Sequence, residues 1–341
     1  MEQLRSASDI INARRIINGP SDKLRAISGS RYPWSREVWK AMVANTWFVE
    51  DVNLGPDKLD FPMLDSGQQL GYLRGLAFLS NLDAIQTDNL TQNVISFITD
   101  PTIQQCIGRQ IAEEYLHVDA YSTMAETILR DPMVVYDMYR HVPQLAAKND
   151  FITRKSQEVT VDPTDENKVK ALVSNMILEG VYFFTGFLTF YTIGRSTGRM
   201  NGSVDMVKYI QRDEVTHLKL FQLTYLSLKQ ERPDLWTPAL EEQLRQQFRD
   251  AAALESAWGH YLIEGGILGL TPQIVTDYVQ YLTEQRASAI GLAGVYPYVR
   301  NPVSWVDDYA RVNTTQSNFF EAKPQTYSQL RPSFGTRTRS S

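Results

Sequence analysis

Apolar residues recur at helical spacing along most of the chain, and polar or proline-containing links separate the periodic stretches. Between residues 33 and 49, for example, Val38, Met42 and Val43 fall on one helical face. We find no credible series of β-hairpins, no solenoid repeat and no glycine-rich phosphate loop. The pattern predicts an all-α fold with helices over residues 33–49, 63–91, 101–130, 133–153, 171–194, 203–230, 238–262 and 272–291.

The stretch from Ala171 to Gly194 is unusual because Glu179 is its only formal charge. A run of about 20 apolar residues can cross a bilayer. Its serine, asparagine and threonine residues, and the lack of a companion span, favour instead a helix at the centre of a large bundle. If this helix is buried, the Glu179 carboxylate needs a cation beside it, and no lysine or arginine on the helix is placed to be that cation. The sequence therefore favours a metal ion as the partner of Glu179.

Two Glu-x-x-His sequences stand 100 residues apart, Glu114 with His117 and Glu214 with His217. Residues three apart on a helix project from the same face, and Tyr121 lies one turn beyond His117 on that face. Carboxylates and imidazoles that face inward together are costly to bury without a charged partner. A single Glu-x-x-His sequence more often lies on a solvated helix face. Two of them in one chain indicate a shared site that binds a charged partner.

Asp83 lies in the apolar half of the predicted helix 63–91, where it either faces solvent beside Asn81 or joins this site. Ferritin-like carboxylate proteins use one carboxylate from each of two helices and Glu-x-x-His from each of two others. Their oxygen-rich ligation, with one nitrogen per metal, suits iron or manganese better than zinc. The sequence therefore predicts a ferritin-like helical bundle with a buried dinuclear metal site, and its ligands in chain order are Asp83, Glu114, His117, Glu179, Glu214 and His217.

Aromatic residues continue the predicted metal-facing stripes. Phe183 and Phe187 follow Glu179 at four-residue steps, which fits plain core packing and would also exclude water. A buried tyrosine usually just hydrogen-bonds its hydroxyl. Beside an oxygen-activating metal pair, Tyr121 is also the side chain that a one-electron oxidation can turn into a radical. We expect Glu113 and Asp119, in the same stretch, to be surface charges.

Composition narrows the class of protein. The chain has 341 residues, of which 43% are hydrophobic and 21% charged, as in an ordinary globular protein. The net charge of −5 gives no basic field for nucleic acid. Cys106 is the only cysteine, which excludes an intramolecular disulfide, and the N-terminus lacks an apolar signal region. We expect a cytoplasmic protein without a membrane span, with an arm (1–30), a ferritin-like helical domain (31–312) and a flexible tail (313–341).

With these residues placed, residues 35–327 resemble the small, radical-generating subunit of class I ribonucleotide reductase. The resemblance rests on several motifs together: Trp47-Phe48-Val49-Glu50, Leu82-Asp83-Ala84-Ile85-Gln86, Glu114-x-x-His117-x-x-x-Tyr121, Leu178-Glu179-Gly180 with Phe183 and Phe187, Arg212-Asp213-Glu214-x-x-His217, Asn301-Pro302 with Trp305, and Asn318-Phe319-Phe320-Glu321 with Tyr327.

The resemblance implies a mechanism. Two iron ions per chain, or manganese instead, would react with an oxygen-derived oxidant and leave a stored radical on Tyr121, shielded by Phe183, Phe187 and Ile210. The oxidising equivalent would pass by His117, Asp213 and Trp47, and then by Tyr327, to a large subunit that reduces ribonucleotides to deoxyribonucleotides. The family also implies a homodimer. Spacing alone would make Trp47 a core residue and Asp213 a partner that holds His117.

The tail departs from many relatives, which end in an acidic and aromatic docking peptide, because it carries Arg331, Arg337 and Arg339 with Phe334. Two other functions share the ligand set. A two-metal oxidase or hydroxylase that acts on an apolar substrate without a large subunit would not need Trp47, Asp213 or a tail tyrosine. A ferritin-like storage bundle would not explain the dry aromatic shell.

Overall fold

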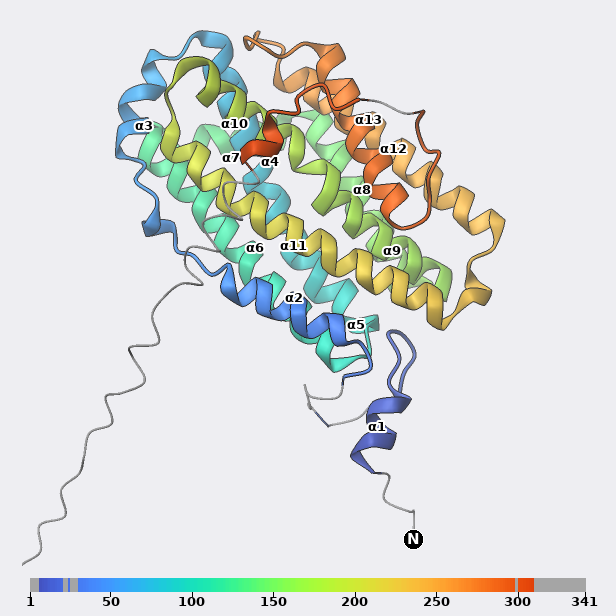
Figure 1. Ribbon diagram of the computed structural model, residues 1–341. Coiled ribbons are helices and arrows are strands. Elements are labelled where there is room, and N and C mark those ends of the chain that lie inside the picture. The colour runs from blue at the N-terminus through green and yellow to red at the C-terminus, as the bar shows by residue number, and fades with distance from the viewer. Residues whose placement is uncertain (1–5, 21–23, 25–29, 298–299, 310–341) are drawn as a thin grey trace, which may run out of the picture.

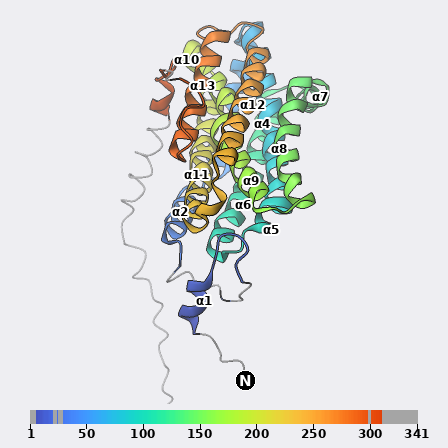
Figure 2. The same ribbon diagram turned by 90° about the vertical axis from the view of Figure 1, so that its right-hand side faces the viewer.

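Long helices packed side by side form the body of the protein, and Figures 1 and 2 show them from two directions. The computed structural model describes residues 6–20, 24, 30–297 and 300–309. Within these residues the only β contact is an isolated bridge between Ile17 and Ile98, so the predicted all-α fold is confirmed. The α-helices are α1 (Ala7–Ala13), α2 (Pro33–Ala44), α3 (Gly55–Asp60), α4 (Ser66–Asn89), α5 (Ile95–Phe97), α6 (Pro101–Ile128), α7 (Met133–His141), α8 (Pro143–Val161), α9 (Asp165–Ile177), α10 (Phe184–Thr197), α11 (Asn201–Glu231), α12 (Pro238–Leu262) and α13 (Pro272–Ala289).

Capping residues explain where several of these helices begin. Asp100, Thr237 and Thr271 precede α6, α12 and α13, and each accepts a hydrogen bond from a backbone N–H of the first turn. Each cap is followed by a proline, which fits the first helical position because that residue needs no N–H partner. Thr164 caps α9 by accepting a hydrogen bond from the backbone N–H of Asn167. These signals place the predicted and observed starts within a few residues of one another.

Two predicted helices have a different form in the structure. The prediction of a single helix over 133–153 is wrong, because α7 ends at His141 and α8 begins at Pro143 and runs to Val161. Proline lacks the N–H that a continuous helix requires and clashes with the preceding turn. The stretch 171–194 is interrupted by a π-helical segment, Leu178–Tyr182, which carries Glu179. Such wide turns are frequent at functional sites.

The apolar path from Asp165 to Thr197 runs through the centre of the bundle, between α4, α11 and α12 (Figure 1). It is long and apolar enough to cross a membrane, yet the most apolar window along it is entirely buried inside the protein. Two of its threonine hydroxyls bond to the helix backbone, and the first of them, Thr189, donates to the carbonyl of Thr185 at 3.0 Å. Thr192 donates likewise to Leu188 at 2.7 Å. The buried polar residues are thus compatible with a central core helix.

Glycines let α4 approach the turn that follows α12. A Cβ on Gly67 would lie 2.1 Å from the carbonyl oxygen of Gly266, and one on Gly71 would lie 2.5 Å from the Ile267 side chain. These contacts explain why a long helix carries residues of poor helix propensity. The close packing holds α4 in register with the centre of the bundle.

An ion pair is buried between α8 and α12. Lys148 and Glu255 are both fully buried, and their charged groups are in direct contact. The Lys148 nitrogen also lies 3.6 Å from the centroid of the Phe78 ring. Burial lowers the pKa of Lys148 to about 8, although the Glu255 charge opposes this. Desolvation therefore outweighs pairing for this lysine.

Candidate metal centre

The six predicted ligands converge at the centre of the bundle, and none of their side chains is exposed. They form two overlapping groups in which the potential ligand atoms all lie within 4.8 Å of one another. Glu114 and Glu214 belong to both groups. The first group adds Asp83 and His117, and the second adds Glu179 and His217. Two sites that share two carboxylates are the arrangement expected of a dinuclear centre.

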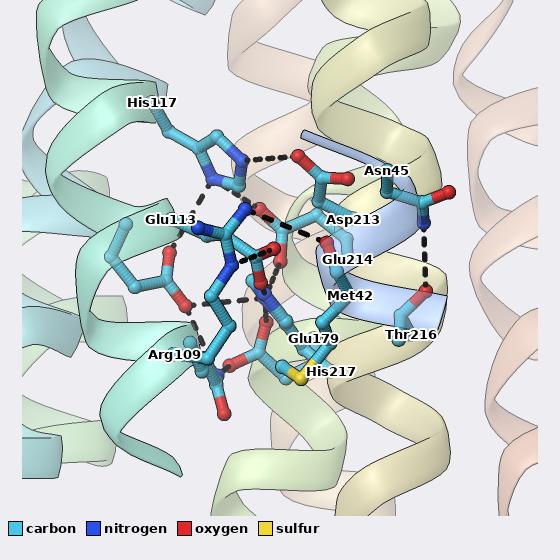
Figure 3. Close-up of polar contacts among 12 residues, drawn as sticks. Met42, Asn45, Arg109, Glu113, His117, Glu179, Asp213, Glu214, Thr216 and His217 are labelled. Atoms are coloured by element: carbon cyan, nitrogen blue, oxygen red, sulfur yellow. Dashed lines mark hydrogen bonds and ion pairs between the residues drawn. The ribbon is translucent and has the colours of Figure 1, made fainter. Parts of the chain in front are cut away.

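Glu114 and Glu214 each offer one oxygen toward each imidazole (Figure 3). In Glu214, Oε1 lies 3.0 Å from Nδ1 of His117, and Oε2 lies 3.0 Å from Nδ1 of His217. The corresponding Glu114 distances are 3.5 and 3.3 Å. Asp83 approaches only His117, at 3.7 Å, and Glu179 approaches only His217, at 3.6 Å. The geometry therefore distinguishes two carboxylates that face both imidazoles from two that each face one.

Burial and mutual repulsion perturb the ionisation of the cluster. Burial raises the pKa of Asp83 and of Glu179 well above the usual range, and two neighbouring carboxylates raise both further. Burial lowers the pKa of His117 and His217, but the surrounding carboxylates outweigh it and raise both pKa values. The two imidazoles lower the pKa of Glu214 despite its burial. In the protein alone, protons share this site, and divalent cations would displace them.

Several polar atoms that face the centre have no hydrogen-bond partner among the described residues. They include both carboxylate oxygens of Asp83, one oxygen each of Glu114, Glu179 and Glu214, and Nδ1 of His117. Buried polar atoms are rarely left unpaired, because the cost of desolvation is then uncompensated. These six atoms belong to five of the six predicted ligands, which is the pattern a metal-binding site leaves. The donor set fits two hard or borderline cations such as iron or manganese.

Each imidazole makes a second carboxylate contact on its far side (Figure 3). Nε2 of His117 lies 3.4 Å from Oδ2 of Asp213, and the Trp47 indole donates to the same oxygen at 2.7 Å. Nε2 of His217 lies 2.9 Å from Oε2 of Glu113. Arg109 in turn donates to Glu113 at 2.9 Å. Such contacts fix the orientation of a ligating imidazole and raise its basicity.

The expectation that Glu113 is a surface charge is wrong, because only 2% of it is exposed. It turns inward to His217, and Arg109, one turn earlier on α6, balances its charge. The Arg-x-x-x-Glu spacing was a signal for this pair, although spacing does not show which way the pair faces. Asp119 is exposed, as predicted.

Buried side-chain amides surround Glu179, and none of these amides was predicted to be a site residue. Gln110 donates to Glu179 at 2.8 Å and also to Glu114 at 3.0 Å. Gln86, one turn after Asp83, donates to Glu179 and, at 3.0 Å, to Asn175. These side chains occupy one oxygen of Glu179 and leave the other, Oε2, facing the centre. These hydrogen bonds fix the orientation of the Glu179 carboxylate.

Tyr121 is fully buried, and its hydroxyl has no hydrogen-bond partner within the described part of the chain. Burial raises its pKa well above the usual value, and the charge of Asp83 adds to this. The Phe183 and Phe187 rings stack with their centroids 5.9 Å apart and, like Ile210, are fully buried. These three apolar side chains are therefore shielded from water. Tyr327 lies outside the described residues.

A helical bundle in which two Glu-x-x-His helices face two further carboxylates defines a ferritin-like two-metal carboxylate protein. The model of the family "Ribonucleotide reductase, small chain" matches residues 27–302, and the chain belongs to this family. It is 33% identical over 329 residues to the ribonucleoside-diphosphate reductase subunit beta of Treponema pallidum, covering 95% of this chain and 93% of that protein. The subunit beta of Halalkalibacterium halodurans is 28% identical over 318 residues, with 92% of each chain covered.

Solved structures agree with the family assignment. The R2 subunit of ribonucleotide reductase from Clostridium botulinum is similar with a TM-score of 0.83 and 34% identity, covering 87% of this chain and 94% of that one. The dimanganese(II)-NrdF of Streptococcus sanguinis has a TM-score of 0.73, covers 85% and 99% of the two chains, and at 17% identity shows the shared fold alone. The chain is the small subunit of a class I ribonucleoside-diphosphate reductase, an oxidoreductase that works with a large subunit. The predicted family, fold and enzyme class are confirmed, and the partner-free oxidase is disfavoured.

Proposed function

We propose that this chain stores an oxidising equivalent as a radical on Tyr121 and passes it through Trp47 toward the large subunit. The observation that carries the proposal is the pair of overlapping ligand groups, which share Glu114 and Glu214 beside a buried, unpartnered tyrosine hydroxyl. Asp83 and His117 would complete one metal site, and Glu179 and His217 the other. When bound, the two ions and an oxygen-derived oxidant supply the one-electron oxidation that no side chain provides alone.

The protein's own contribution is to hold and isolate the oxidised tyrosine. Tyr121 has no exposed surface, and Phe183, Phe187 and Ile210 are buried, apolar and resistant to oxidation. A radical in such a shell is kept from water and from dissolved reductants. Among the described residues, no side chain hydrogen-bonds to this hydroxyl, so none of them is positioned to return a proton directly to the oxidised oxygen.

A continuous set of contacts leads away from the centre. The Trp47 indole donates to Asp213, and the same carboxylate oxygen lies beside His117. The Trp47 and His117 rings are also nearly parallel, with centroids 6.4 Å apart and planes inclined by 22°. This arrangement supports a transfer path by His117, Asp213 and Trp47, with Tyr327 as the later relay in the tail.

The proposed metals are two iron ions per chain, with manganese as the other candidate. The donor set suits both ions, and manganese is the metal named for the Streptococcus sanguinis protein. We further propose a homodimer in the cytoplasm. Phe48 and Tyr115 are each 61% exposed, and the segment directly after Phe48, Val49–Asp51, packs on α6, which carries Tyr115. We propose that these two rings belong to an apolar association surface.

A turnover assay with the large subunit tests the transfer path. We expect Trp47→Phe to form the Tyr121 radical at parent yield and to lose ribonucleotide reduction. Trp34→Phe is the matched control, because Trp34 donates to Ser227 and does not belong to the ligand groups of the centre. Full turnover by Trp47→Phe would refute the path and leave the radical-storage claim to be judged separately.

A further inference from the structure

Glu179 is the only predicted metal ligand that does not stand on a regular α-helix. It lies in the π-helical segment Leu178–Tyr182, whereas the other ligands lie on α4, α6 and α11. A π-helical turn closes its hydrogen bonds one residue later than an α-helical turn and is rare. Because each residue of an α-helix turns the chain by about 100°, a return to regular winding would change the direction of Glu179 relative to α10. The position of this carboxylate therefore depends on what holds the segment.

Arg286, on α13, contacts the residue directly after Glu179. Its Nε donates to the carbonyl oxygen of Gly180 at 3.2 Å. A Cβ on Gly180 would lie 3.1 Å from Cγ of Arg286, closer than an ordinary contact, so the arginine stem packs directly on the glycine backbone. The guanidinium also lies 5.3 Å from the centroid of the Phe184 ring, on the first residue of α10. Arg286 thus joins the π-helical segment to the helix that follows it.

Lys148, on α8, contacts the last residue of the segment. Its Nζ donates to the carbonyl oxygen of Tyr182 at 3.4 Å and lies 4.6 Å from the centroid of the ring of the same residue. The lysine is fully buried and in direct contact with Glu255 on α12. Hydrogen bonds from charged donors are stronger than those between neutral groups. Two carbonyls of the segment therefore accept from cations on helices that carry no predicted metal ligand.

We propose that Arg286 and Lys148 are positioning residues that hold the π-helical segment and thereby direct the Glu179 carboxylate at the metal centre. The inference rests on the two-metal centre proposed above. Gln86 and Gln110 bond to the carboxylate of Glu179 itself, whereas the two cations fix the backbone from which this side chain extends. Neither cation belongs to the ligand groups, so each acts on the metal only through Glu179.

Anaerobic titration of the metal-free, full-length chain with manganese(II) tests this role. The electron paramagnetic resonance signal of free manganese(II) measures the unbound metal, and the two binding steps are fitted separately. Arg286→Met retains an unbranched stem but removes the donor, whereas Arg286→Lys retains a cationic donor. Arg245→Met is the matched control, because Arg245 on α12 also donates to a backbone carbonyl, that of Ala293, at 3.3 Å.

We expect Arg286→Met to weaken one binding step by about tenfold or more, the usual effect of losing a contact that orients a ligand. The other step should keep the parent affinity, and Arg286→Lys should recover most of the loss. Arg245→Met should bind as the parent does. Glu179→Ala should weaken the same step as Arg286→Met, and combining the two should cause no further loss, because a residue that acts through Glu179 has no effect in its absence.

Lys148 is tested together with its ion-pair partner, because a single buried charge left behind would destabilise the chain. Lys148→Met combined with Glu255→Leu should retain most of the free energy of unfolding in urea, yet weaken the step that depends on Glu179 by about tenfold. Stability and metal affinity would then change independently, as a positioning role requires.

Parent affinity in Arg286→Met, or in the double variant of Lys148 and Glu255, would overturn the role of the cation concerned. An equal loss in both binding steps, or a further loss when Arg286→Met is added to Glu179→Ala, would show a general effect on the fold and would also overturn the proposal. A parent chain that binds fewer than two manganese ions would instead overturn the metal centre, and with it the proposed function.

Discussion

Glu113 lies 2.9 Å from Nε2 of His217, on the side of the imidazole that faces away from the metal-binding centre. Asp213 stands in the same relation to His117, at 3.4 Å. Both imidazoles are therefore backed by a carboxylate, but the two carboxylates have different partners. Asp213 accepts from the Trp47 indole, whereas Glu113 accepts from the Arg109 guanidinium. Of these two carboxylates, only Asp213 is hydrogen-bonded to an oxidisable aromatic residue, Trp47, within the described part of the chain.

Neutralising Glu113 should weaken metal binding. Glu113→Gln retains the size of the side chain but removes the charge that orients His217 and raises its basicity. Loss of such an outer contact typically lowers metal affinity by about tenfold to a hundredfold. Competition with a chromophoric chelator measures the affinity, and Asp119→Asn, on the exposed face of the same helix, is the control. Equal affinity in Glu113→Gln and the parent would show that Glu113 does not support the site.

Metal uptake should weaken as the pH falls. The pKa values of Asp83 and Glu179 are raised by burial, and those of His117 and His217 are raised by the surrounding carboxylates, so the metal-free site retains protons at neutral pH. Metal ions must displace these protons, and acidification therefore favours the metal-free form. Chelator competition over a pH series, together with proton release into weakly buffered solution, measures the linkage. Affinity independent of pH, without proton release, would contradict the assigned protonation.

The buried pair of Lys148 and Glu255 should affect stability more when one partner is removed than when both are. Glu255→Gln leaves the lysine charge buried without a counter-charge, which typically costs about 3–5 kcal/mol. Lys148→Met combined with Glu255→Leu removes both charges, and we expect it to recover most of that loss. Urea unfolding of the metal-free chains gives the free energies. A double variant whose loss equals the sum of the losses in Lys148→Met and Glu255→Leu would show that the two charges are not coupled and would contradict this account.

The six side chains that sequence spacing singled out lie together in the structure, because each stands on a helix face whose pattern is local. Glu-x-x-His specifies its own geometry, and the isolation of Glu179 among apolar residues required burial beside a cation. Asp83 was ambiguous because spacing does not reveal which side of α4 meets the bundle. Glu113 and Gln110 were assigned no role in the site, since Glu113 contacts His217 and Gln110 contacts Glu179, and both contacts join residues far apart in the sequence.

The fold, too, was predicted best where the signal is local in the sequence. Helix α12 has the predicted bounds 238–262, because its cap and its periodicity are both local signals. The π-helical segment at Leu178–Tyr182 leaves no trace in a stretch that is apolar all round. Pro143 was a visible signal for the break between α7 and α8, and the apolar pattern on either side concealed it.

The central claim is that this dinuclear centre produces a radical on Tyr121. Its most direct test is an electron paramagnetic resonance spectrum of the metal-loaded, oxygen-treated full-length chain, recorded for the parent and for Tyr121→Phe with the metal content of each measured. We predict a tyrosyl radical signal in the parent, its loss in Tyr121→Phe, and two metal ions per chain in both. An unchanged signal in Tyr121→Phe would contradict the assignment of the radical to this residue, and no signal from a fully loaded parent would contradict radical storage itself.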